Sequence, residues 1–559
     1  MISRLGRTPV LRGLLAIMLL LITVLPVSAA QNSVVNVQIL ALNDFHGNLE
    51  PPSGSSGRIG AIDAGGVEYL AAHIQQLKSQ NPNTVVVSAG DLIGASPLIS
   101  ALFHDEPTIE AFNLIGLDFN AVGNHEFDEG VVELLRMQQG GCHPVDGCLD
   151  GDGFEGANFE FLAANVAIDG TKKTIFPPVR VRIFQGVPVA FIGMTLEGTP
   201  TIVTPSGVEG LRFMDEADTV NALIPQLKRK GVKAIVVLIH EGGVQPGAYN
   251  DCNGISGPIV DIVNRTDDEV DLFVSGHTHQ AYNCVIDGRV VTSAASFGRL
   301  VTDIDLQLDR TTWDVVSVQA ENKIVTRDVP AAPALTNLVN RYRELVAPLA
   351  NRVIGTITGD ITRSTNAAGE SALGDVIADS QLFVTAPAGF GEAVVAFMNP
   401  GGIRADLIYN QNPGGEAPGE VTYNEIFTVQ PFGNSLVTMS LTGAQIDTLL
   451  EQQFDNPAPG QSRILQVSEG FTYTWSQSAP AGSKVDIASI MINGVPIDPN
   501  AVYRITVNSF LADGGDNFFV LREGTDRLGG EVDLDAVEAY FAANSPVAPG
   551  PQNRITVVP

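Results

Sequence analysis

The sequence predicts an α/β (α+β) fold made of two units that a helix joins. Runs of apolar and β-branched residues, typical of buried strands, alternate with stretches whose apolar residues recur at helical spacing. This alternation indicates strands and helices packed in layers around a shared core. The clearest strands of the first unit lie at residues 35–42, 84–88, 233–239 and 270–274, its clearest helices at 66–78 and 218–230, and a strand-rich return at 285–308. With 559 residues, 44% of them hydrophobic, the chain is long enough for two or more domains.

Residues 1–30 have the pattern of an export signal. A basic start with Arg4, Arg7 and Arg12 is followed by an apolar stretch and then by the small residues Ser28-Ala29-Ala30. We expect this segment to be removed, which makes the mature chain a secreted or periplasmic protein with no stable membrane span. The alternative is an uncleaved membrane anchor, which is disfavoured because the apolar run is short for a span.

The chain is strongly acidic. Its formal net charge is −30, and it becomes −33 without residues 1–30, which leaves 29 basic residues against 62 acidic ones. Such a surface repels the backbone of a nucleic acid and an anionic membrane. A polymeric nucleic acid is therefore excluded as the expected partner, although a few arginines could still bind a small phosphate ester.

In the first unit, residues 31–330, five short polar segments follow the ends of apolar runs. They are Asp44-Phe45-His46, Gly90-Asp91, Gly123-Asn124-His125-Glu126, His240 and Gly276-His277-Thr278-His279, and they hold five of the eight histidines. Polar residues just beyond the carboxyl ends of strands meet in one crevice of a layered fold. Carboxylate, amide and imidazole ligands suit Zn, Mn or Fe better than a soft metal. The layout therefore predicts a site for two metal ions.

The alternative for each segment is a loop residue that makes only local hydrogen bonds. One such motif alone would not decide between the two interpretations, but five in series favour the metal site. The remaining histidines, His73, His104 and His143, fall outside these segments, and we expect them to be surface or structural residues. Glu126 and Glu241 are expected to support the ligands from behind or to face solvent.

The four cysteines form two close sets. Cys142 and Cys148 lie in a Gly/Asp-rich stretch, and Cys252 and Cys284 flank the segment that leads into Gly276. Outside the cytoplasm we expect Cys142–Cys148 and Cys252–Cys284 disulfides. Free buried thiols or a zinc site are the alternatives, but the closely spaced cysteine pairs of structural zinc sites are missing.

Residues 331–352 are predicted to form a linker helix, and residues 353–559 a second unit. Pro330 and Pro333 break the chain, after which apolar residues from Leu335 to Leu349 recur at helical spacing. In the second unit, helices are expected at 372–385 and 442–454, strands at 470–475 and 502–507, and a Gly/Pro-rich loop at 410–420.

The order of the five polar segments resembles that of the calcineurin-like metallophosphoesterases. Three segments of the second unit extend the resemblance to the secreted 5'-nucleotidase family, over nearly the whole mature chain. These segments are Asn399-Pro400-Gly401-Gly402-Ile403-Arg404, Gln430-Pro431-Phe432-Gly433-Asn434 and the stretch 508–516. The resemblance implies a four-layer metallophosphoesterase β-sandwich followed by a smaller α+β substrate-binding domain.

The resemblance also implies roles for the residues of the first unit. Two divalent metal ions, Zn, Mn or similar, would be bound by one set of residues each, with Asp91 bridging the two ions. The first ion would take Asp44, His46 and His279, and the second Asn124, His240 and His277. His125, held by Asp128, would act beside the phosphoryl group as a stabiliser or proton donor.

In the second unit the resemblance implies that Phe432 and Phe510 enclose a nucleobase and that Asp516 binds the ribose hydroxyls. Asn399 would contact the base and Arg404 the phosphate. Either phenylalanine could instead be an ordinary core residue, although their turn-rich settings favour exposure. The chain departs from the family where many members carry an arginine, because residues 367–369 are Ala-Ala-Gly and the nearest arginine is Arg363. Phosphate contacts from this segment are therefore an open question.

Together these features predict an exported dimetal phosphohydrolase that removes phosphate from nucleotides. Cleavage of UDP-sugars or dinucleotide pyrophosphates, and of 2',3'-cyclic nucleotides, are alternatives because the same metal pair would serve each reaction. A non-catalytic binding protein on the same scaffold is a more remote alternative, since the ligand set is complete. The sequence assigns neither the preferred nucleotide nor an oligomeric state.

Overall fold

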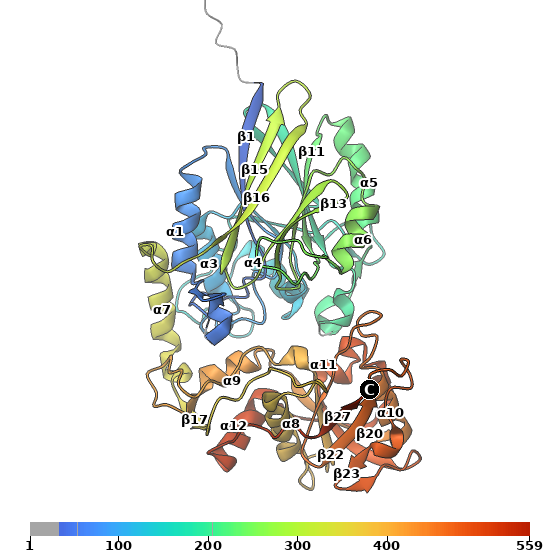
Figure 1. Cartoon of the computed structure of the whole chain (residues 1–559). Helices are drawn as coiled ribbons and strands as arrows, with labels where there is room; N and C mark the ends of the chain where they lie inside the picture. The colour runs from blue at the N-terminus through green and yellow to red at the C-terminus, as the bar shows by residue number, and fades with distance from the viewer. Residues whose placement is uncertain (1–32, 53, 204) are drawn as a thin grey trace, which may run out of the picture.

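The computed structural model describes residues 33–52, 54–203 and 205–559, so the expected export signal lies outside the described residues. Figure 1 shows two bodies, the first carrying the long strands and the second lying against one end of them. Helix α7 (Pro333–Ala350) runs along one side and leads from the first body into the second. Among the described residues, no helix is both long and apolar enough to cross a membrane.

Two six-stranded sheets form the first body. One has the order β16 (Val315–Ile324), β15 (Leu300–Asp309), β1 (Val34–Leu42), β4 (Thr84–Ser88), β5 (Phe119–Ala121) and β6 (Glu160–Leu162). The other has the order β13 (Ala281–Ile286), β14 (Arg289–Ala294), β12 (Leu272–Ser275), β11 (Ala234–His240), β9 (Val187–Thr195) and β8 (Val179–Phe184). The strands β1, β4, β5 and β6 are parallel, as are β9, β11, β12 and β14. Each sheet therefore gathers the carboxyl ends of its parallel strands at one edge.

Alternate residues of the central strands face different layers, which explains why these strands are apolar throughout. Val37 and Ile39 of β1 pack between the two sheets, whereas Leu40 and Leu42 face the helices outside. In the same way, Val236 of β11 faces the other sheet. Helices α1 (Val67–Lys78), α3 (Glu106–Ile115) and α4 (Val131–Gln139) cover the first sheet, and α5 (Glu216–Arg229) and α6 (Pro258–Arg265) cover the second. The predicted four-layer sandwich is confirmed.

The helix that joins the two bodies is packed on the first of them. Its apolar face, including Leu335, Val339 and Tyr342, is buried in the same core as helices α1 and α3. The Tyr342 hydroxyl group also lies 3.0 Å from a carboxylate oxygen of Glu110 and 3.0 Å from one of Asp150. The apolar stripe of α7 therefore completes the core of the sandwich.

The second body contains a five-stranded and a four-stranded sheet. The first has the order β21 (Gln466–Val467), β18 (Val395–Met398), β25 (Val502–Asn508), β20 (Ser435–Thr442) and β26 (Thr525–Val532); the second has the order β24 (Val495–Pro496), β23 (Met491–Ile492), β22 (Phe471–Ser476) and β27 (Ile555–Val558). Helix α8 (Ala372–Thr385) has the predicted bounds, because the Ser371 side chain accepts a hydrogen bond from the Gly374 N–H and caps the first turn. Helix α10 (Gly443–Glu451) ends three residues before its predicted end.

Both expected disulfides are present. The Cα atoms of Cys142 and Cys148 are 4.8 Å apart, and those of Cys252 and Cys284 are 5.0 Å apart. The first disulfide closes a ring between residues only six apart, whereas the second spans 32 residues and has its Cys284 end buried in β13. The two disulfides should therefore contribute differently to stability, because a longer ring removes more entropy from the unfolded chain.

We expect the Cys252→Ser, Cys284→Ser double variant to lose about 3–4 kcal/mol of unfolding free energy, and the Cys142→Ser, Cys148→Ser variant about 2 kcal/mol, by loop-closure entropy. Urea unfolding followed by circular dichroism would measure both values under oxidising conditions. Reduction of the wild-type protein should reproduce the combined loss. A larger loss from the short ring than from the long one would contradict the loop-entropy argument.

Candidate active site

The candidate metal ligands lie at the end of the sandwich that faces the second body. Asp44, Asp91 and Asn124 follow β1, β4 and β5 of one sheet, while His240, His277 and His279 lie at or just beyond the ends of β11 and β12 of the other. His46 follows Asp44 on the same loop. The structure therefore brings all seven expected ligands, from both sheets, to one place.

The backbone at these positions turns sharply after each strand. Asp44, His46, Asp91, His277 and His279 have positive φ angles of 50°, 48°, 50°, 70° and 55°. This conformation is uncommon for residues other than glycine, and it marks positions that the surrounding structure holds in place.

Glycines beside the ligands allow the loops to approach one another. A Cβ atom on Gly123 would collide with the Asp91 carboxylate, and one on Gly90 would lie 2.6 Å from Nδ1 of His240. These two positions need glycine because the loop after β5 lies directly against the loop after β4, and the loop after β4 lies against the end of β11 in the other sheet.

Asp44, His46 and His279 form one group of converging ligand atoms. Nε2 of His46 is 3.1 Å from Nε2 of His279, and Oδ1 of Asp44 lies 3.4 Å from the latter nitrogen. Nδ1 of His46 is 2.9 Å from the carbonyl oxygen of Gly94, which can only accept. The His46 proton therefore sits on Nδ1, and its Nε2 presents a lone pair to the group.

Asp91, Asn124, His240 and His277 form the second group. Nε2 of His240 lies 2.9 Å from Oδ2 of Asp91 and 3.1 Å from Oδ1 of Asn124, and Nδ1 of His277 lies 3.0 Å from the same Asn124 oxygen. Nδ1 of His240 is 2.8 Å from the carbonyl oxygen of Ala89. Oδ2 of Asp91 is also 3.6 Å from Nε2 of His46, so this carboxylate faces both groups.

These contacts bring together oxygen and nitrogen acceptors that need a positive charge between them. Burial lowers the pKa of His240, but the Asp91 carboxylate outweighs this effect and raises it to about 10. Burial lowers the pKa of His46 to about 3, so that imidazole is neutral. A proton on His240 supplies part of this positive charge, and a metal cation would take its place. The donor set therefore fits two divalent cations.

Two side chains brace the site: Glu126, for which the sequence left a supporting or a solvent-facing position open, and Asn43, which it did not single out. Glu126 is 3% exposed and accepts hydrogen bonds from the backbone N–H groups of Asp91, Leu92 and Gly123 at 2.7–3.0 Å. It therefore ties two ligand loops together and is not a solvated residue, and burial raises its pKa to about 7. Asn43 donates a hydrogen bond of 2.6 Å to the Asp44 carboxylate. Glu126 belongs to the Gly123-Asn124-His125-Glu126 segment and could be identified from the sequence, whereas no sequence pattern distinguishes Asn43.

His125 lies beside both groups and outside their ligand sets: its ring centroid is 5.1 Å from that of His46, and its backbone N–H donates to Asp91 at 2.9 Å. Its Nδ1 is 2.7 Å from Oδ2 of Asp128, because the short 3₁₀ helix η2 (His125–Phe127) places the two side chains on one face. Burial lowers the pKa of His125, but Asp128 and Asp91 outweigh it and raise the pKa above its ordinary value. The expected pairing of these residues is thus present in the geometry.

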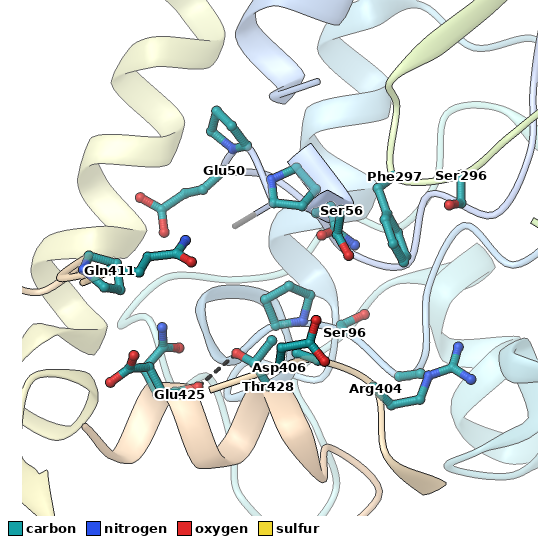
Figure 2. A pocket seen from close by; sticks show the side chains of 18 of the residues that line it. Glu50, Ser56, Ser96, Ser296, Phe297, Arg404, Asp406, Gln411, Glu425 and Thr428 are labelled. Carbon is teal, nitrogen blue, oxygen red and sulfur yellow. Dashed lines mark hydrogen bonds between the residues drawn. The ribbon is translucent and has the colours of Figure 1, made fainter. Parts of the chain in front are cut away.

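The second body reaches this site from the opposite side. The Phe432 ring stacks on the His125 ring with centroids 5.6 Å apart, and the Arg404 guanidinium carbon lies 5.7 Å from the Phe432 centroid. A cavity of about 440 Å³ extends from here between the two bodies, lined by Arg363 and Arg404 of the second body and by Phe297 and His279 of the first. Figure 2 shows Phe297 and Arg404 on opposite sides of this cavity.

Arg363 supports Arg404 and also faces the cavity. It donates a hydrogen bond of 2.6 Å from Nη1 to the Arg404 carbonyl oxygen, and its backbone N–H donates to Asp406 at 2.9 Å. The cavity thus contains arginine side chains although residues 367–369 lack one.

The remaining expected substrate residues form a group around Asp516. Asn399 donates a hydrogen bond of 2.9 Å to the Asp516 carboxylate, and Arg463 pairs with the other oxygen of that carboxylate. Phe510 is partly buried, and its ring packs closely against Gly515. A Cβ atom at position 515 would lie 2.5 Å from the Phe510 ring. Arg463 was not identified from the sequence, because nothing in its local sequence distinguishes it from a surface arginine.

Comparisons with known proteins agree with this architecture. Residues 37–281 match the family described as calcineurin-like phosphoesterase, and residues 353–523 match the family described as 5'-nucleotidase, C-terminal domain. Together the two matches cover well over half of the chain.

Relatives with known names match most of this chain. The chain is 33% identical to endonuclease YhcR of Bacillus subtilis over 532 residues, and this match covers 93% of this chain and 41% of that protein. It is 32% identical over 517 residues to cell wall protein Lmo0130 of Listeria monocytogenes, covering 88% of this chain and 64% of that protein. The chain therefore spans less than two thirds of either relative. A 5'-nucleotidase of Vibrio cholerae is 26% identical over 91% of this chain and 90% of its own length.

Among solved structures, a 5'-nucleotidase precursor of Thermus thermophilus superposes with a TM-score of 0.76 at 27% identity, covering 94% of this chain and 99% of that chain. The sandwich with its converging ligands and the second body thus follow a single known two-domain plan. The chain belongs to the 5'-nucleotidase family of metal-dependent phosphoesterases, with a calcineurin-like phosphoesterase domain followed by a 5'-nucleotidase C-terminal domain.

Proposed function

We propose that this protein is an exported dimetal phosphohydrolase that removes the phosphate group from nucleotides. The observation that carries the proposal is the meeting of Phe432 and Arg404 with His125 directly beside the converging ligands. An aromatic ring and a guanidinium group are the side chains that recognise a nucleobase and a phosphate. Their place at the ligand cluster supports a substrate that carries both groups.

Two divalent ions, Zn or Mn, would be held by the two ligand groups, with Asp91 facing both. Asp44, His46 and His279 would hold one ion, and Asn124, His240 and His277 the other. When bound, such ions lower the pKa of a water molecule and offset the charge of a phosphoryl group under attack. The carbonyl oxygens of Gly94 and Ala89 keep His46 and His240 in the tautomers that this role requires.

The other side chains of the site would handle the substrate. Arg404, supported by Arg363, would bind phosphate oxygens through its planar donors. His125 would stabilise the phosphoryl group or donate a proton to the leaving oxygen, with Asp128 holding its ring and favouring the protonated form.

The nucleoside would extend from the phosphate into the second domain. Phe432 and Phe510 are both partly buried, which leaves part of each ring for a base to stack on. Asp516 would accept hydrogen bonds from the ribose hydroxyls, and Asn399 would contact the base. Since Arg463 and Asn399 already contact the Asp516 carboxylate, these residues would also orient it.

The proposed organisation assigns residues 1–30 to the export signal, 31–330 to the catalytic domain, 331–352 to the linker helix and 353–559 to the substrate-binding domain. The two disulfides support an oxidising location for the mature chain. The net charge of −30 supports a small nucleotide, and not a nucleic-acid polymer, as the substrate.

Phosphate release from a substrate panel tests the proposal. We expect nucleoside monophosphates to be hydrolysed with a higher kcat/KM than p-nitrophenyl phosphate, because only nucleotides use the second domain. The panel should include nucleoside di- and triphosphates, a UDP-sugar and a 2',3'-cyclic nucleotide. A higher kcat/KM for one of the last two would assign the site to pyrophosphate or cyclic-diester cleavage instead.

Two substitutions separate metal binding from catalysis. The Asp91→Ala protein should lose most of its bound metal and essentially all activity, because this carboxylate faces both ligand groups. The His125→Ala protein should keep its metal and lose roughly 10²–10⁴-fold in kcat, the usual contribution of a positioned proton donor. Elemental analysis and steady-state kinetics on the same preparations measure both quantities. Loss of metal from His125→Ala would show that this histidine is a ligand.

Phe510 offers the sharper test of base recognition, because Phe432 also packs on His125. We expect Phe510→Ala to raise KM for a nucleoside monophosphate by an amount equivalent to roughly 1–3 kcal/mol, with little effect on p-nitrophenyl phosphate. Phe383→Ala is a matched control, since Phe383 is 42% exposed on α8, away from the site. An equal loss of activity on both substrates in Phe510→Ala would identify Phe510 as a core residue.

A further inference from the structure

A second group of metal-type side chains lies outside the candidate active site. His104 follows α2 (Leu98–Ala101), while His143 and Asp146 lie within the ring closed by Cys142 and Cys148. We call His104, His143 and Asp146 the outer cluster. The sequence predicted that both histidines are surface or structural residues, and nothing in the metallophosphoesterase ligand pattern includes them.

The ligand atoms of the outer cluster converge on one carboxylate. Nε2 of His104 is 3.0 Å from Oδ2 of Asp146, and Nδ1 of His143 is 3.1 Å from the same oxygen. Nδ1 of His143 also accepts a hydrogen bond of 3.1 Å from the Asp146 backbone N–H, which a bound metal ion would displace. The two imidazole rings stack with centroids 3.9 Å apart, so their nitrogen-bearing edges face the carboxylate together. These separations match those between the ligand atoms of the candidate active site, which are 2.9–3.1 Å for the closest pairs.

A second carboxylate orients His104. Nδ1 of His104 is 2.7 Å from Oε2 of Glu129, so a proton on Nδ1 is bound there and Nε2 is directed to Asp146. Metal-ligating histidines commonly have such a carboxylate on the other ring nitrogen. The neighbouring Glu133 is paired with Arg136 at 2.6 Å. Its charge still adds to the negative potential that Glu129 and Asp146 create at His104.

The loop that carries His143 and Asp146 is built as a small closed ring. Besides the disulfide, the backbone N–H of His143 donates to the Gly147 carbonyl oxygen at 3.2 Å, and the Gly147 N–H donates back at 2.9 Å. Both side chains of the loop are therefore held on one side of the ring, toward His104. The side chains of His104 and His143 are 17% and 16% exposed, so the cluster is shielded and yet reachable by an ion.

We propose that the outer cluster is a third cation site, which binds Zn²⁺ or a similar divalent transition metal through His104, His143 and Asp146. Zn–N and Zn–O distances of about 2.0–2.2 Å place the ligands of a tetrahedral ion roughly 3.3 Å apart, close to the separations found here. Three protein ligands from two histidines and one carboxylate are a common set for zinc, with a water molecule in the fourth position.

The alternative occupant of the cluster is a proton. Hydrogen bonding to Glu129 and Asp146 raises the pKa of His104 to about 9, against the opposing effect of burial. The negative potential that favours this proton also favours a metal cation, and the two compete for Nε2. Metal binding must therefore displace a proton, and affinity should fall as the pH is lowered.

The location of the outer cluster gives the ion a structural role near the catalytic centre. A cavity of about 110 Å³ is lined by His104 and Glu129 together with His125 and Asp128 of the candidate active site and Phe432 of the second domain. An ion at the outer cluster would join the disulfide-closed loop to the segment between α2 and α3. It would thereby fix one wall of this cavity, without contacting the substrate.

Metal counting on the full-length mature protein tests the proposal. Wild-type, His143→Asn, Asp146→Asn and His73→Asn proteins are incubated with Zn²⁺, freed of unbound metal by gel filtration and measured by elemental analysis. We expect both outer-cluster variants to hold one equivalent less zinc than the wild type. His73→Asn is the matched control, because His73 is a partly buried histidine whose ring contacts the Thr326 carbonyl oxygen at 3.2 Å, outside the cluster.

The difference between proteins is the informative quantity, because it does not depend on how many ions the active site binds. Thermal unfolding supplies a second readout: Zn²⁺ should raise the Tm of the metal-depleted wild type more than that of either variant. Circular dichroism verifies that each variant is folded, and Asp146, whose side chain is 45% exposed, is the substitution that disturbs packing least. Equal zinc content in folded wild-type and variant proteins would overturn the proposal and assign the cluster to an ion pair of protonated His104.

Discussion

Two buried carboxylates at the edge of the sandwich, those of Asp44 and Asp91, impose the constraint on which the rest of the structure depends. They are at most 1% exposed, and a charge in such a place must be paired or hydrogen-bonded. The backbone N–H groups of His277 and His125 donate to them, and imidazoles from both sheets surround them. The surrounding side chains leave a net negative charge at the site, which divalent cations are suited to balance.

Holding these groups together requires a rigid frame. Left-handed backbone at non-glycine residues costs about 1–3 kcal/mol each, and five expected ligands adopt it. The layered core offsets this cost, because the loops that carry the ligands begin at strands buried on both faces. Glu126 then ties the loop after β4 to the loop after β5 through three backbone hydrogen bonds, so that Asp91 and Asn124 keep their relative positions.

The second domain contributes further side chains to the site. The sandwich concentrates acceptors, whereas Arg404 and Phe432 bring a cation and an aromatic face to the same place from the other side of the cavity. Helix α7 belongs to the core of the sandwich, so the position of the second domain is set where that helix ends. The outer cluster lies at the same boundary, next to His125 and Phe432.

The sequence by itself determined the layered fold, the helix at 372–385 and the convergence of the ligand segments. Each of these is a local pattern: an apolar run, a stretch of helical character, or a polar residue just after a strand. Only the tertiary structure decided that Arg463 pairs with Asp516, that Phe432 stacks on His125, and that His104 meets His143 and Asp146. These partners are distant in the sequence and have no periodic or spacing signal, because packing between separate elements, and not local chain geometry, brings them together.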